Sequence, residues 1–532
     1  MIEIGGLHLK LETFLHHLHF DTEKLTPPDW QVDWEDAPLP YKLYRGLPSI
    51  PLPGDVPLTL SRRDSQAEPG LEELGYFLWY VYGLSHYAQS PFIEDKEGQT
   101  EVSYAQLFRR YVPSGGALYP NELYLYVKLE ELPTGIYHYD VAHHRLSLLR
   151  EGNYDSYLSR SLGNCHVSDC FCTVFVSTVF WKNFYKYNNF SYRLQGLDTG
   201  VVIGQALEAA DVMGFSSRVC YQFLDRSINH LLGLSQQDES VYAVIPLSIY
   251  PSIHCGEEEP VSAVELSREV PLLKTETYNR SKRVLDYPVL KEMNEASMLE
   301  NTQSFVKVKK NNPIKKAFAF GTEFVVLPFP ESFSYDFAAV CRERHSPDLD
   351  FMIGKVSQTS ISTLFKEIFS FSYQNDLDDP LENSEPRLSL NGIFYNVEGV
   401  QNGAYAYDKS AHALRRISNG DFRESLQSGL TMPTVNLFQV PLCLHVVGDK
   451  SHLIDELGYR GYRIQQMEAG ILVQRLLLIS CALGMGGHPL LGFDAKQCDE
   501  LYEAESKRIT SLIQIPVGPY RPRAWLKGSL NS

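Results

Sequence analysis

The sequence lacks the features that mark several common protein classes. Its 532 residues contain no uninterrupted run of about 20 apolar residues, the length that a bilayer-spanning helix needs. The first residues, Met1-Ile2-Glu3-Ile4, show neither the basic segment nor the apolar segment of a secretory signal. Positive charge is also in deficit, because 48 Lys and Arg stand against 65 Asp and Glu, for a formal charge of −17. We therefore expect a soluble, cytoplasmic protein that binds neither nucleic acid nor an anionic membrane.

Cysteine is sparse, and the motifs of several enzyme classes are missing. The nine cysteines, among them Cys165, Cys170 and Cys172, do not fall into the paired CxxC spacing of a zinc site. We expect reduced, mostly buried thiols and no bound metal. No HExxH, G-x-S-x-G, Walker or G-x-G-x-x-G motif is present, which argues against metal, nucleophile and nucleotide-fold chemistry. A nicotinamide that visits as a reductant stays open.

What the sequence does contain is a repeat of domain size. The sequence Gly-Ile-Tyr-His-Tyr-Asp at residues 135–140 returns as Gly-Ala-Tyr-Ala-Tyr-Asp at residues 403–408, an offset of 268. Further anchors lie 270 residues apart: Tyr192 and Tyr462, Arg193 and Arg463, Gly200 and Gly470, Gly214 and Gly484. Solenoid repeats have periods of about 20 to 50 residues, so this longer period indicates a duplicated domain.

Local patterns predict similar elements in the two halves. Runs rich in β-branched and aromatic residues predict strands at 122–128, 171–179, 240–248 and 509–517. Apolar residues at helical spacing predict helices at 71–85, 197–213 and 467–483, and the last of these is apolar on all sides and therefore central. We expect two domains, 58–255 and 316–532, joined by a connector at 256–315. Eight prolines between Pro27 and Pro57 predict that residues 1–57 form an extended arm.

Particular motifs carry a resemblance to a known family. Residues 113–120 read Pro-Ser-Gly-Gly-Ala-Leu-Tyr-Pro, and Glu122 and the pair Lys186-Tyr187 follow. The second half carries Arg344-His345-Ser346, Gly492-Phe493-Asp494, and Ile515-Pro516-Val517-Gly518 followed by Arg521 and Arg523. On these motifs the chain resembles the nitroreductase-like FMN flavoproteins, in particular the SagB/ThcOx-type azoline oxidases. The resemblance implies an α+β fold in which two tandem domains, each a mixed central sheet wrapped by helices, form an intramolecular pseudo-dimer around FMN.

Two glycine-containing segments suit the walls of a flavin-ring site. A flat ring must lie close to backbone N–H groups, and only residues without bulk allow that approach. Pro113, Ser114, Gly115 and Gly116 are predicted to form one wall, and the segment of Pro489, Leu491 and Gly492 a second. The ordinary alternative for Pro-Ser-Gly-Gly is a simple turn.

A phosphate group needs fixed donors and positive charge, which the second half can supply. Arg344, His345 and Ser346, with Arg521 and Arg523, are predicted to form the clamp, because Arg presents a planar fork to phosphate oxygens and Ser adds a hydroxyl. Solvated surface arginines are the alternative. Asp348 departs from the family pattern, in which a basic residue is common at this position.

The two halves differ where the site should lie. When the two halves are aligned, residues 113–120 correspond to the acidic segment 381–388 of the second half, and Gly492 corresponds to Gln222 of the first half. We therefore predict one composite site, with the phosphate held by the second half and the ring and substrate side built by the first. Arg62, Arg63 and Ser65 leave a second, weaker flavin site open.

Lys186 and Tyr187 are the candidate catalytic residues. In the oxidases that the chain resembles, such a pair lies beside the flavin and is implied in proton transfer. The equivalent positions in the second half hold Glu456 and Leu457, which supports a single site. The alternative is that Lys186 is a solvated lysine. His138 and His166 have no partner at ligand spacing and are predicted to be core or surface residues.

The expected function is FMN-dependent oxidation of peptide thiazolines or oxazolines to thiazoles or oxazoles, with dioxygen reoxidising the flavin. The expected substrate is a modified peptide or a small azoline, and cyclodehydratase enzymes are expected partners. Two alternatives stay open. One is an NAD(P)H-dependent nitro- or quinone-reductase of the same superfamily, and the other is a noncatalytic docking subunit of a peptide-modifying complex.

Overall fold

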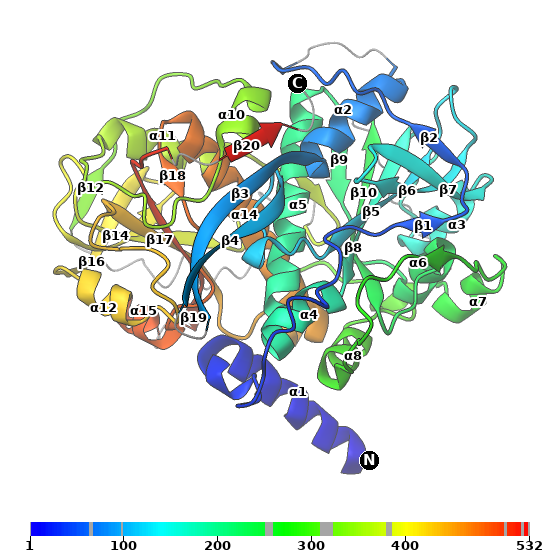
Figure 1. The fold of residues 1–532 in the computed structure, drawn as a ribbon, viewed down its shortest axis with the longest axis horizontal. Helices are drawn as coiled ribbons and strands as arrows, with labels where there is room; N and C mark the ends of the chain where they lie inside the picture. The colour runs from blue at the N-terminus through cyan, green and yellow to red at the C-terminus, as the bar shows by residue number, and fades with distance from the viewer. Residues whose placement is uncertain are drawn as a thin grey trace.

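The protein is an α+β molecule with two similar halves that lie side by side (Figure 1). The computed structural model describes residues 2–62, 68–96, 99–250, 259–308, 323–378, 386–504, 508–522 and 526–529. In Figure 1 the first half is blue to green, the second is green to red, and two long helices lie between them. These helices are α5 (Ser191–Val212) and α14 (Tyr459–Ala482).

The first half is built on a sheet of eight described strands, in the order β13-β9-β10-β8-β5-β6-β7-β2. The central strands are buried along nearly their whole length because helices cover both faces, which explains their uninterrupted Val, Phe, Tyr and Leu content. The bounds are β2 Ser49–Pro51, β5 Asn121–Val127, β6 Gly135–Asp140, β7 Arg145–Glu151, β8 Cys172–Val179, β9 Ser216–Val219, β10 Glu239–Ser248 and β13 Gln374–Asn375.

The second half repeats this sheet with seven described strands, in the order β12-β16-β15-β14-β17-β19-β18. Apart from β13, which has no counterpart, the two orders correspond strand for strand when one is read in reverse. The structure therefore confirms the tandem duplication. The bounds are β12 Phe324–Val326, β14 Ser389–Phe394, β15 Gly403–Asp408, β16 Ala413–Asn419, β17 Leu442–Asp449, β18 Gly486–Gly487 and β19 Ile509–Gly518.

Helices cover the sheets and fill the space between them. The strands and helices predicted from sequence are present, with ends that differ by a few residues. Within the described residues, no helix combines the length and apolarity needed to cross a membrane. The further helices are α1 Ile2–Phe20, α2 Leu71–Tyr82, α3 Asp155–Ser161, α4 Trp181–Tyr187, α6 Asp225–Leu232, α7 Ala263–Ser267, α8 Pro288–Ala296, α10 Phe337–Glu343, α11 Gln358–Ser370, α12 Arg423–Ser428, α13 Ile454–Leu457 and α15 Ala495–Leu501.

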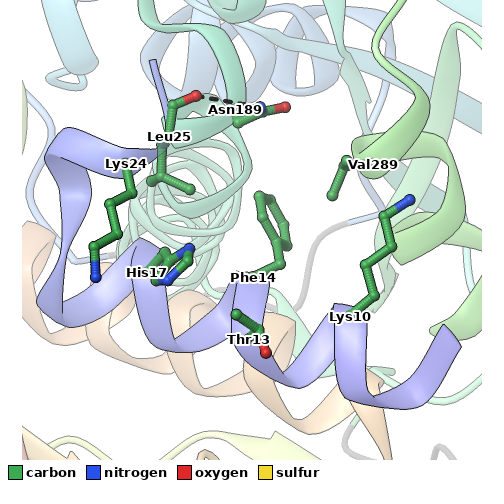
Figure 2. A pocket seen from close by; sticks show the side chains of 8 residues that line it. All are labelled: Lys10, Thr13, Phe14, His17, Lys24, Leu25, Asn189 and Val289. Atoms are coloured by element: carbon green, nitrogen blue, oxygen red, sulfur yellow. Dashed lines mark hydrogen bonds between the residues drawn. The ribbon is translucent and has the colours of Figure 1, made fainter. Parts of the chain in front are cut away.

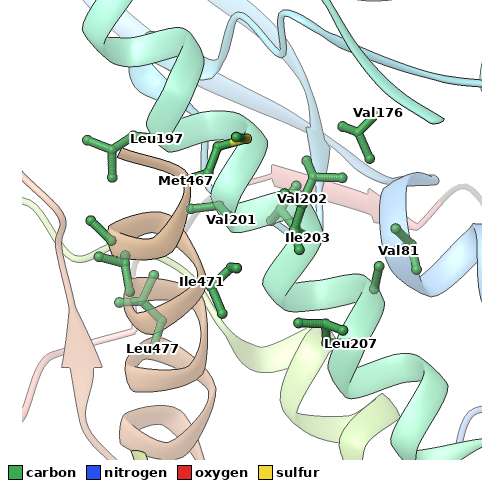
Figure 3. Close-up of a cluster of buried hydrophobic side chains, with 14 of the residues drawn as sticks. Val81, Val176, Leu197, Val201, Val202, Ile203, Leu207, Met467, Ile471 and Leu477 are labelled. Carbon is green, nitrogen blue, oxygen red and sulfur yellow. The ribbon is translucent and has the colours of Figure 1, made fainter. Parts of the chain in front are cut away.

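The repeated glycines form the seam between the halves. A Cβ added to Gly200 of α5 would lie 2.0 Å from the Met467 carbonyl oxygen, and a Cβ added to Gly470 of α14 would lie 2.3 Å from that of Leu197. The helix backbones therefore touch, and this approach requires glycine on each side. Figure 3 shows Leu197 and Val201 of α5 beside Met467 and Ile471 of α14 around this crossing.

The repeated Tyr-Arg pairs also lie at the seam. The rings of Tyr192 and Tyr462 stack, with centroids 5.9 Å apart. Arg193 of the first half donates to the Leu512 carbonyl of the second at 2.6 Å. Reciprocally, Arg463 of the second half pairs with the buried Asp225 of the first at 3.3 Å. Each half thus supplies buried donors to the other, as subunits of a dimer would.

Several features differ from the sequence-based expectations. The predicted extended arm begins with the 19-residue helix α1, which buries Leu11, Phe14, Leu15 and Leu18 at helical spacing. Strand β13 of the second half adds to the sheet of the first by pairing in parallel with β9. Cys165 takes part in a disulfide, whereas thiols were expected; seven other cysteines are free.

A β-hairpin, which was not predicted, precedes the glycine-rich motif. It consists of β3 (Leu84–Lys96) and β4 (Gln99–Arg110). Strand β20 (Leu526–Ser529), near the end of the chain, pairs with β3. The hairpin therefore joins the first half to the last described segment of the second, at the centre of Figure 1.

The seam can be tested by adding a side chain to it. We expect Gly470→Val to lower the free energy of unfolding by about 1–3 kcal/mol or more, because backbone rather than a movable side chain blocks the new atoms. Thermal unfolding would measure the effect. Gly54→Ala is the control, because an added Cβ there meets nothing within 4 Å. Equal unfolding midpoints for the two variants would contradict the backbone contact.

Candidate functional site

The glycine-rich motif forms a tight loop between β4 and β5. Residues 115–117 make a short 3-10 turn, and Gly116 lies in the left-handed region with φ of +63°. Ala117 and Tyr119 also have positive φ, at +57° and +48°, which is costly for residues with side chains. Such a backbone persists only where its surroundings hold it in place.

Asp198 of α5 stabilises this loop through hydrogen bonds. Its carboxylate accepts a hydrogen bond from Ser114 Oγ at 2.7 Å and from the Gly115 N–H at 3.2 Å. Ser114 Oγ in turn accepts from the Tyr119 N–H at 2.9 Å, so that one side chain braces both ends of the turn. Burial raises the pKa of Asp198 to about 7, although the hydrogen bonds from Ser114 and Gly115 oppose the shift.

Lys186 and Tyr187, at the end of α4, close directly on the loop. A Cβ added to Gly116 would lie 2.5 Å from Tyr187 Oη and 2.8 Å from Lys186 Nζ. The glycine thus leaves room for an amine and a phenol beside backbone. Lys186 Nζ also lies 5.2 Å from the centre of the Trp34 ring, which the Pro-rich segment contributes.

The surroundings of this pair alter its acid–base properties. Burial lowers the pKa of Lys186, since the charged ammonium loses solvent. Burial raises the pKa of Tyr187, and the nearby Asp198 raises it further. An amine that loses its proton more readily therefore lies beside a phenol that keeps its own.

A buried ion pair fixes α4 against the loop. Lys182, one turn before Lys186, pairs with Glu122 at the start of β5 and donates to the Tyr119 carbonyl at 3.3 Å. Glu122 also pairs with the His138 ring at 2.9 Å. Burial alone would raise the pKa of Glu122, but Lys182 and His138 outweigh it and lower the pKa to about 2. His138 is thus a core residue and His166 is exposed, as expected.

Arg344 of the second half reaches the same loop across the seam. It follows α10, is only 9% exposed, and donates from Nε to the Tyr111 carbonyl at 2.7 Å. Tyr111 lies two residues before Pro113. The Arg344 Nη1 atom is buried without a hydrogen-bond partner. A buried guanidinium donor without a partner is costly, and an anionic ligand would satisfy it.

The other predicted clamp residues cluster near Arg344 to different degrees. The His345 ring packs against Tyr520, with centroids 4.6 Å apart, and Ser346 follows it, half-buried. The Arg521 N–H donates to the Asp350 carbonyl at 2.9 Å, which brings this exposed arginine beside the 344–352 segment. Arg523 lies outside the described residues.

The predicted second wall lies against the second half's own elements. Gly492 faces Thr431, whose Cβ would lie 3.2 Å from an added Cβ, and Leu490 pairs with Gln514. Pro489 and Leu491 are half-buried on either side of Leu490. Two neighbouring residues of α5 contact this segment and the glycine-rich loop, respectively. Arg193 lies over the Phe493 ring at 5.9 Å, while a Cβ added to Gly115 would meet the next residue, Leu194, at 2.7 Å.

The corresponding place in the second half is closed by ion pairs. Glu468 is the counterpart of Asp198, and it binds Arg387 at 2.8 Å instead of a glycine-rich loop. Arg387 also pairs with Asp378. A cavity of about 140 Å³ is left beside these groups. The segment 379–385 lies outside the described residues.

The first-half counterparts of the phosphate clamp do not resemble Arg344. Arg62 is 71% exposed and pairs with Asp211 at 2.9 Å. Arg63 and Ser65 lie outside the described residues. Among the described residues, the first-half counterparts of the clamp therefore offer a second flavin phosphate only the exposed guanidinium of Arg62.

Asp198 and Lys182 were missed by the sequence reasoning. A signal for Asp198 was present, because it is a carboxylate in an otherwise apolar stretch of α5 and aligns with Glu468. No comparable signal marked Lys182, whose partner Glu122 lies 60 residues away. In the described part of the chain, no group of three or more His, Cys, Asp or Glu is placed to hold a metal ion.

The chain is similar to several known proteins. Residues 72–247 match the model of the nitroreductase family. The microcin B17-processing protein McbC of Escherichia coli is 30% identical over 142 residues, which cover 24% of this chain and 50% of McbC. The trifolitoxin-processing protein TfxB of Rhizobium leguminosarum bv. trifolii is 28% identical over 158 residues, which cover 27% and 41%. The chain thus spans half or less of the length of these curated relatives.

A solved structure is similar over nearly the whole chain. It is a putative nitroreductase from Anabaena variabilis, with a TM-score of 0.70, 19% identity, and coverage of 96% of this chain and 99% of the other. The fold is therefore that of a tandem nitroreductase-like α+β protein. Residues 72–247 thus match the nitroreductase family, and the two curated relatives are named for the processing of microcin B17 and trifolitoxin.

The role of Asp198 predicts a pH dependence of stability. Its pKa rises from 3.8 to about 7 on folding, so its contribution to stability is fully present below the lower value and is lost as pH rises through the higher one. In Asp198→Asn this loss should disappear. Thermal unfolding midpoints measured across that pH range would show the wild type converging on or falling below the variant as pH rises.

The control for this experiment is Asp211→Asn, a half-exposed carboxylate farther along the same helix. Its unfolding midpoint should follow the pH profile of the wild type. Parallel profiles for the wild type and Asp198→Asn would refute the proposed titration of Asp198.

Proposed function

We propose that the chain is an FMN-dependent dehydrogenase that oxidises thiazoline or oxazoline rings of a peptide to the aromatic azoles. One observation carries the proposal: Lys186 Nζ and Tyr187 Oη lie against the backbone of Gly116, where no Cβ keeps them away, while Arg344 brings an unpaired donor from the other half. The reaction needs these functions together, namely a cradle for a planar redox group, an anchor for an anion and a base.

The residues present fit FMN. Gly115 and Gly116 leave their backbone free of side-chain bulk, and Ser114 adds only a short hydroxyl side chain, so this loop suits the edge of a flat ring. The buried Nη1 of Arg344 is a donor suited to a phosphate oxygen. His345 and Ser346 follow Arg344 in the chain, and we propose that they and Arg521 complete the phosphate clamp. When bound, FMN supplies a two-electron acceptor for hydride, with dioxygen as the terminal oxidant.

Lys186 is the proposed base. Converting an azoline to an azole removes a proton and a hydride from adjacent ring carbons, so the C–H electron pair of one carbon forms the new double bond while the hydride leaves the other. A neutral Lys186 amine accepts the proton at Nζ, and its lowered pKa raises the neutral fraction. Tyr187 stays protonated and can donate a hydrogen bond that orients the substrate ring.

A peptide substrate is supported by the relatives rather than by the site alone. McbC and TfxB are named for the processing of microcin B17 and trifolitoxin. We extend this to a modified peptide as the substrate and to cyclodehydratase enzymes as the partners that form the azoline. An NAD(P)H-driven nitro- or quinone-reductase is the competing function in the same family.

Arg344 tests the anchor. We expect Arg344→Met to weaken FMN binding about 10- to 100-fold, which corresponds to the loss of about 1.5–3 kcal/mol of charged hydrogen bonding. Arg344→Lys should lose less, because it keeps the charge without the planar fork. Titration of the stripped protein with FMN would measure the change. Arg62→Met, in the first-half counterpart, should bind FMN as the wild type does; an equal loss there would contradict a single anchor.

Lys186 tests the chemistry. Mixing the FMN-loaded protein with a thiazoline peptide, without oxygen or nicotinamide, should bleach the flavin colour, and Lys186→Met should slow this about 10²- to 10⁴-fold without loss of FMN. The wild-type rate should rise with pH, because the base must lose its proton, and the variant should lack that rise. Lys274→Met removes an exposed lysine and serves as the control. Bleaching by NADH but not by the azoline would favour the reductase.

A further inference from the structure

A surface groove lies next to the helix that carries Lys186 and Tyr187. Its volume is about 430 Å³, and its walls come from α1, the segment after it, the short turn at 188–190 and α8. Figure 2 shows Phe14 of α1 pointing toward Asn189 and Val289, with Lys10 and Lys24 at opposite ends. No residue of the proposed FMN site lines this groove.

The groove combines an apolar floor with a basic rim. Phe14, Leu25 and Val289 supply the apolar surface, and Lys10, His17 and Lys24 surround it. The Lys10 and Lys24 side chains are 53% and 54% exposed. This rim stands out on a chain whose formal charge is −17. Acidic ligands are repelled by most of such a surface, and a local basic rim would concentrate them.

The acidic residues near the rim only partly neutralise it. Lys10 pairs with Glu292 at 3.0 Å. Lys24 pairs with Asp21 at 3.1 Å, but Asp21 is shared with Lys496 at 2.7 Å and with the His16 ring at 3.4 Å. Asp494 and Glu23 also lie near Lys496. None of the described residues that line the groove is acidic, so Lys10 and Lys24 are the charged groups that it presents to a ligand.

The groove is continuous with the catalytic segment. Asn189, which lines the groove, lies two residues after Tyr187, and its Nδ2 donates to the Leu25 carbonyl at 3.2 Å. Phe14 packs against Tyr192 at the start of α5, with ring centroids 6.2 Å apart. A peptide bound in the groove would need only a few further residues to reach Lys186, because an extended peptide covers about 3.3 Å per residue.

We infer that the groove binds an acidic, leucine-type segment of the peptide substrate that flanks the ring to be oxidised. The inference rests on the proposed function. The apolar side chain of the segment would enter between Phe14, Leu25 and Val289, and its carboxylates would face Lys10 and Lys24. This contact would favour rings carried on peptides, because a small azoline cannot reach the groove and the base together.

The binding test needs neither flavin nor turnover. The probe is a fluorescein-labelled peptide that alternates leucine with glutamates, and fluorescence anisotropy measures its affinity for the full chain. We expect Lys10→Glu combined with Lys24→Glu to weaken binding about tenfold, and Glu292→Gln to tighten it a few-fold. Lys274→Glu reverses an exposed charge elsewhere and should change little. Unfolding midpoints equal to that of the wild type show that the variants are folded.

Kinetics separate this inference from the proposed function. With the double variant, the KM for a thiazoline peptide with an acidic flank should rise about tenfold, whereas the KM and kcat for a small thiazoline should not change. Equal affinities and equal KM values for the double variant and the wild type would overturn the groove and leave the oxidase standing. A chain that binds the probe but oxidises neither thiazoline would overturn the function instead. Dimerisation that the double variant abolishes would also overturn the inference, since a second copy would then fill the groove.

Discussion

The contact between the α5 and α14 backbones is the constraint on which the rest of the structure depends. Gly200 meets the Met467 carbonyl, and Gly470 meets that of Leu197, so the two helices are locked in one relative position. The residues that follow these carbonyls are Glu468 and Asp198. The same crossing therefore sets the place of both carboxylates, one under each half of the pseudo-dimer.

From this symmetric frame the two halves use their carboxylates differently. Asp198 accepts hydrogen bonds from Ser114 and Gly115 and so supports an open, glycine-lined loop. Glu468 binds Arg387, whose bulk fills the equivalent space. The duplicated domain thus keeps its architecture, which depends on buried packing, while the two ligand-facing surfaces have diverged. One half supplies the loop with Lys186 and Tyr187, and the other supplies Arg344.

The repeat and most of the fold could be predicted from the sequence, because they depend on periodic burial. Matched anchors such as Gly200 and Gly470 revealed the duplication, and runs of β-branched residues marked the central strands. The exchanged strand β13 could not be predicted, since two residues carry no period. The strands of the β3–β4 hairpin contain many Ser, Gln and charged residues, and therefore lack the β-branched runs that marked the central strands. Helix α1 could have been predicted from the helical spacing of Leu11, Phe14, Leu15 and Leu18. The eight prolines at 27–57 favour extended structure only for the residues that follow the helix.

The candidate site was predictable only in part, for a physical reason. Small residues and adjacent Lys-Tyr pairs leave local motifs, as residues 113–120 and Lys186-Tyr187 do. The partner of Arg344 leaves none, because Arg344 approaches a backbone carbonyl, that of Tyr111, which any residue would provide. Asp198 acts through backbone and hydroxyl donors in the same way. The roles of all the predicted site residues, from residues 113–116 and Lys186-Tyr187 to Arg344 and the segment from Pro489 to Gly492, stay predictions.

The central claim is that two diverged halves build one composite site. The FMN released on denaturing the purified chain, divided by the chain concentration, tests it most directly. The account predicts one FMN per chain. Two FMN per chain would show that the space beside Arg387 and Glu468 also binds the cofactor, and none after saturation with FMN would remove the redox group from the proposed reaction; either result would contradict the account.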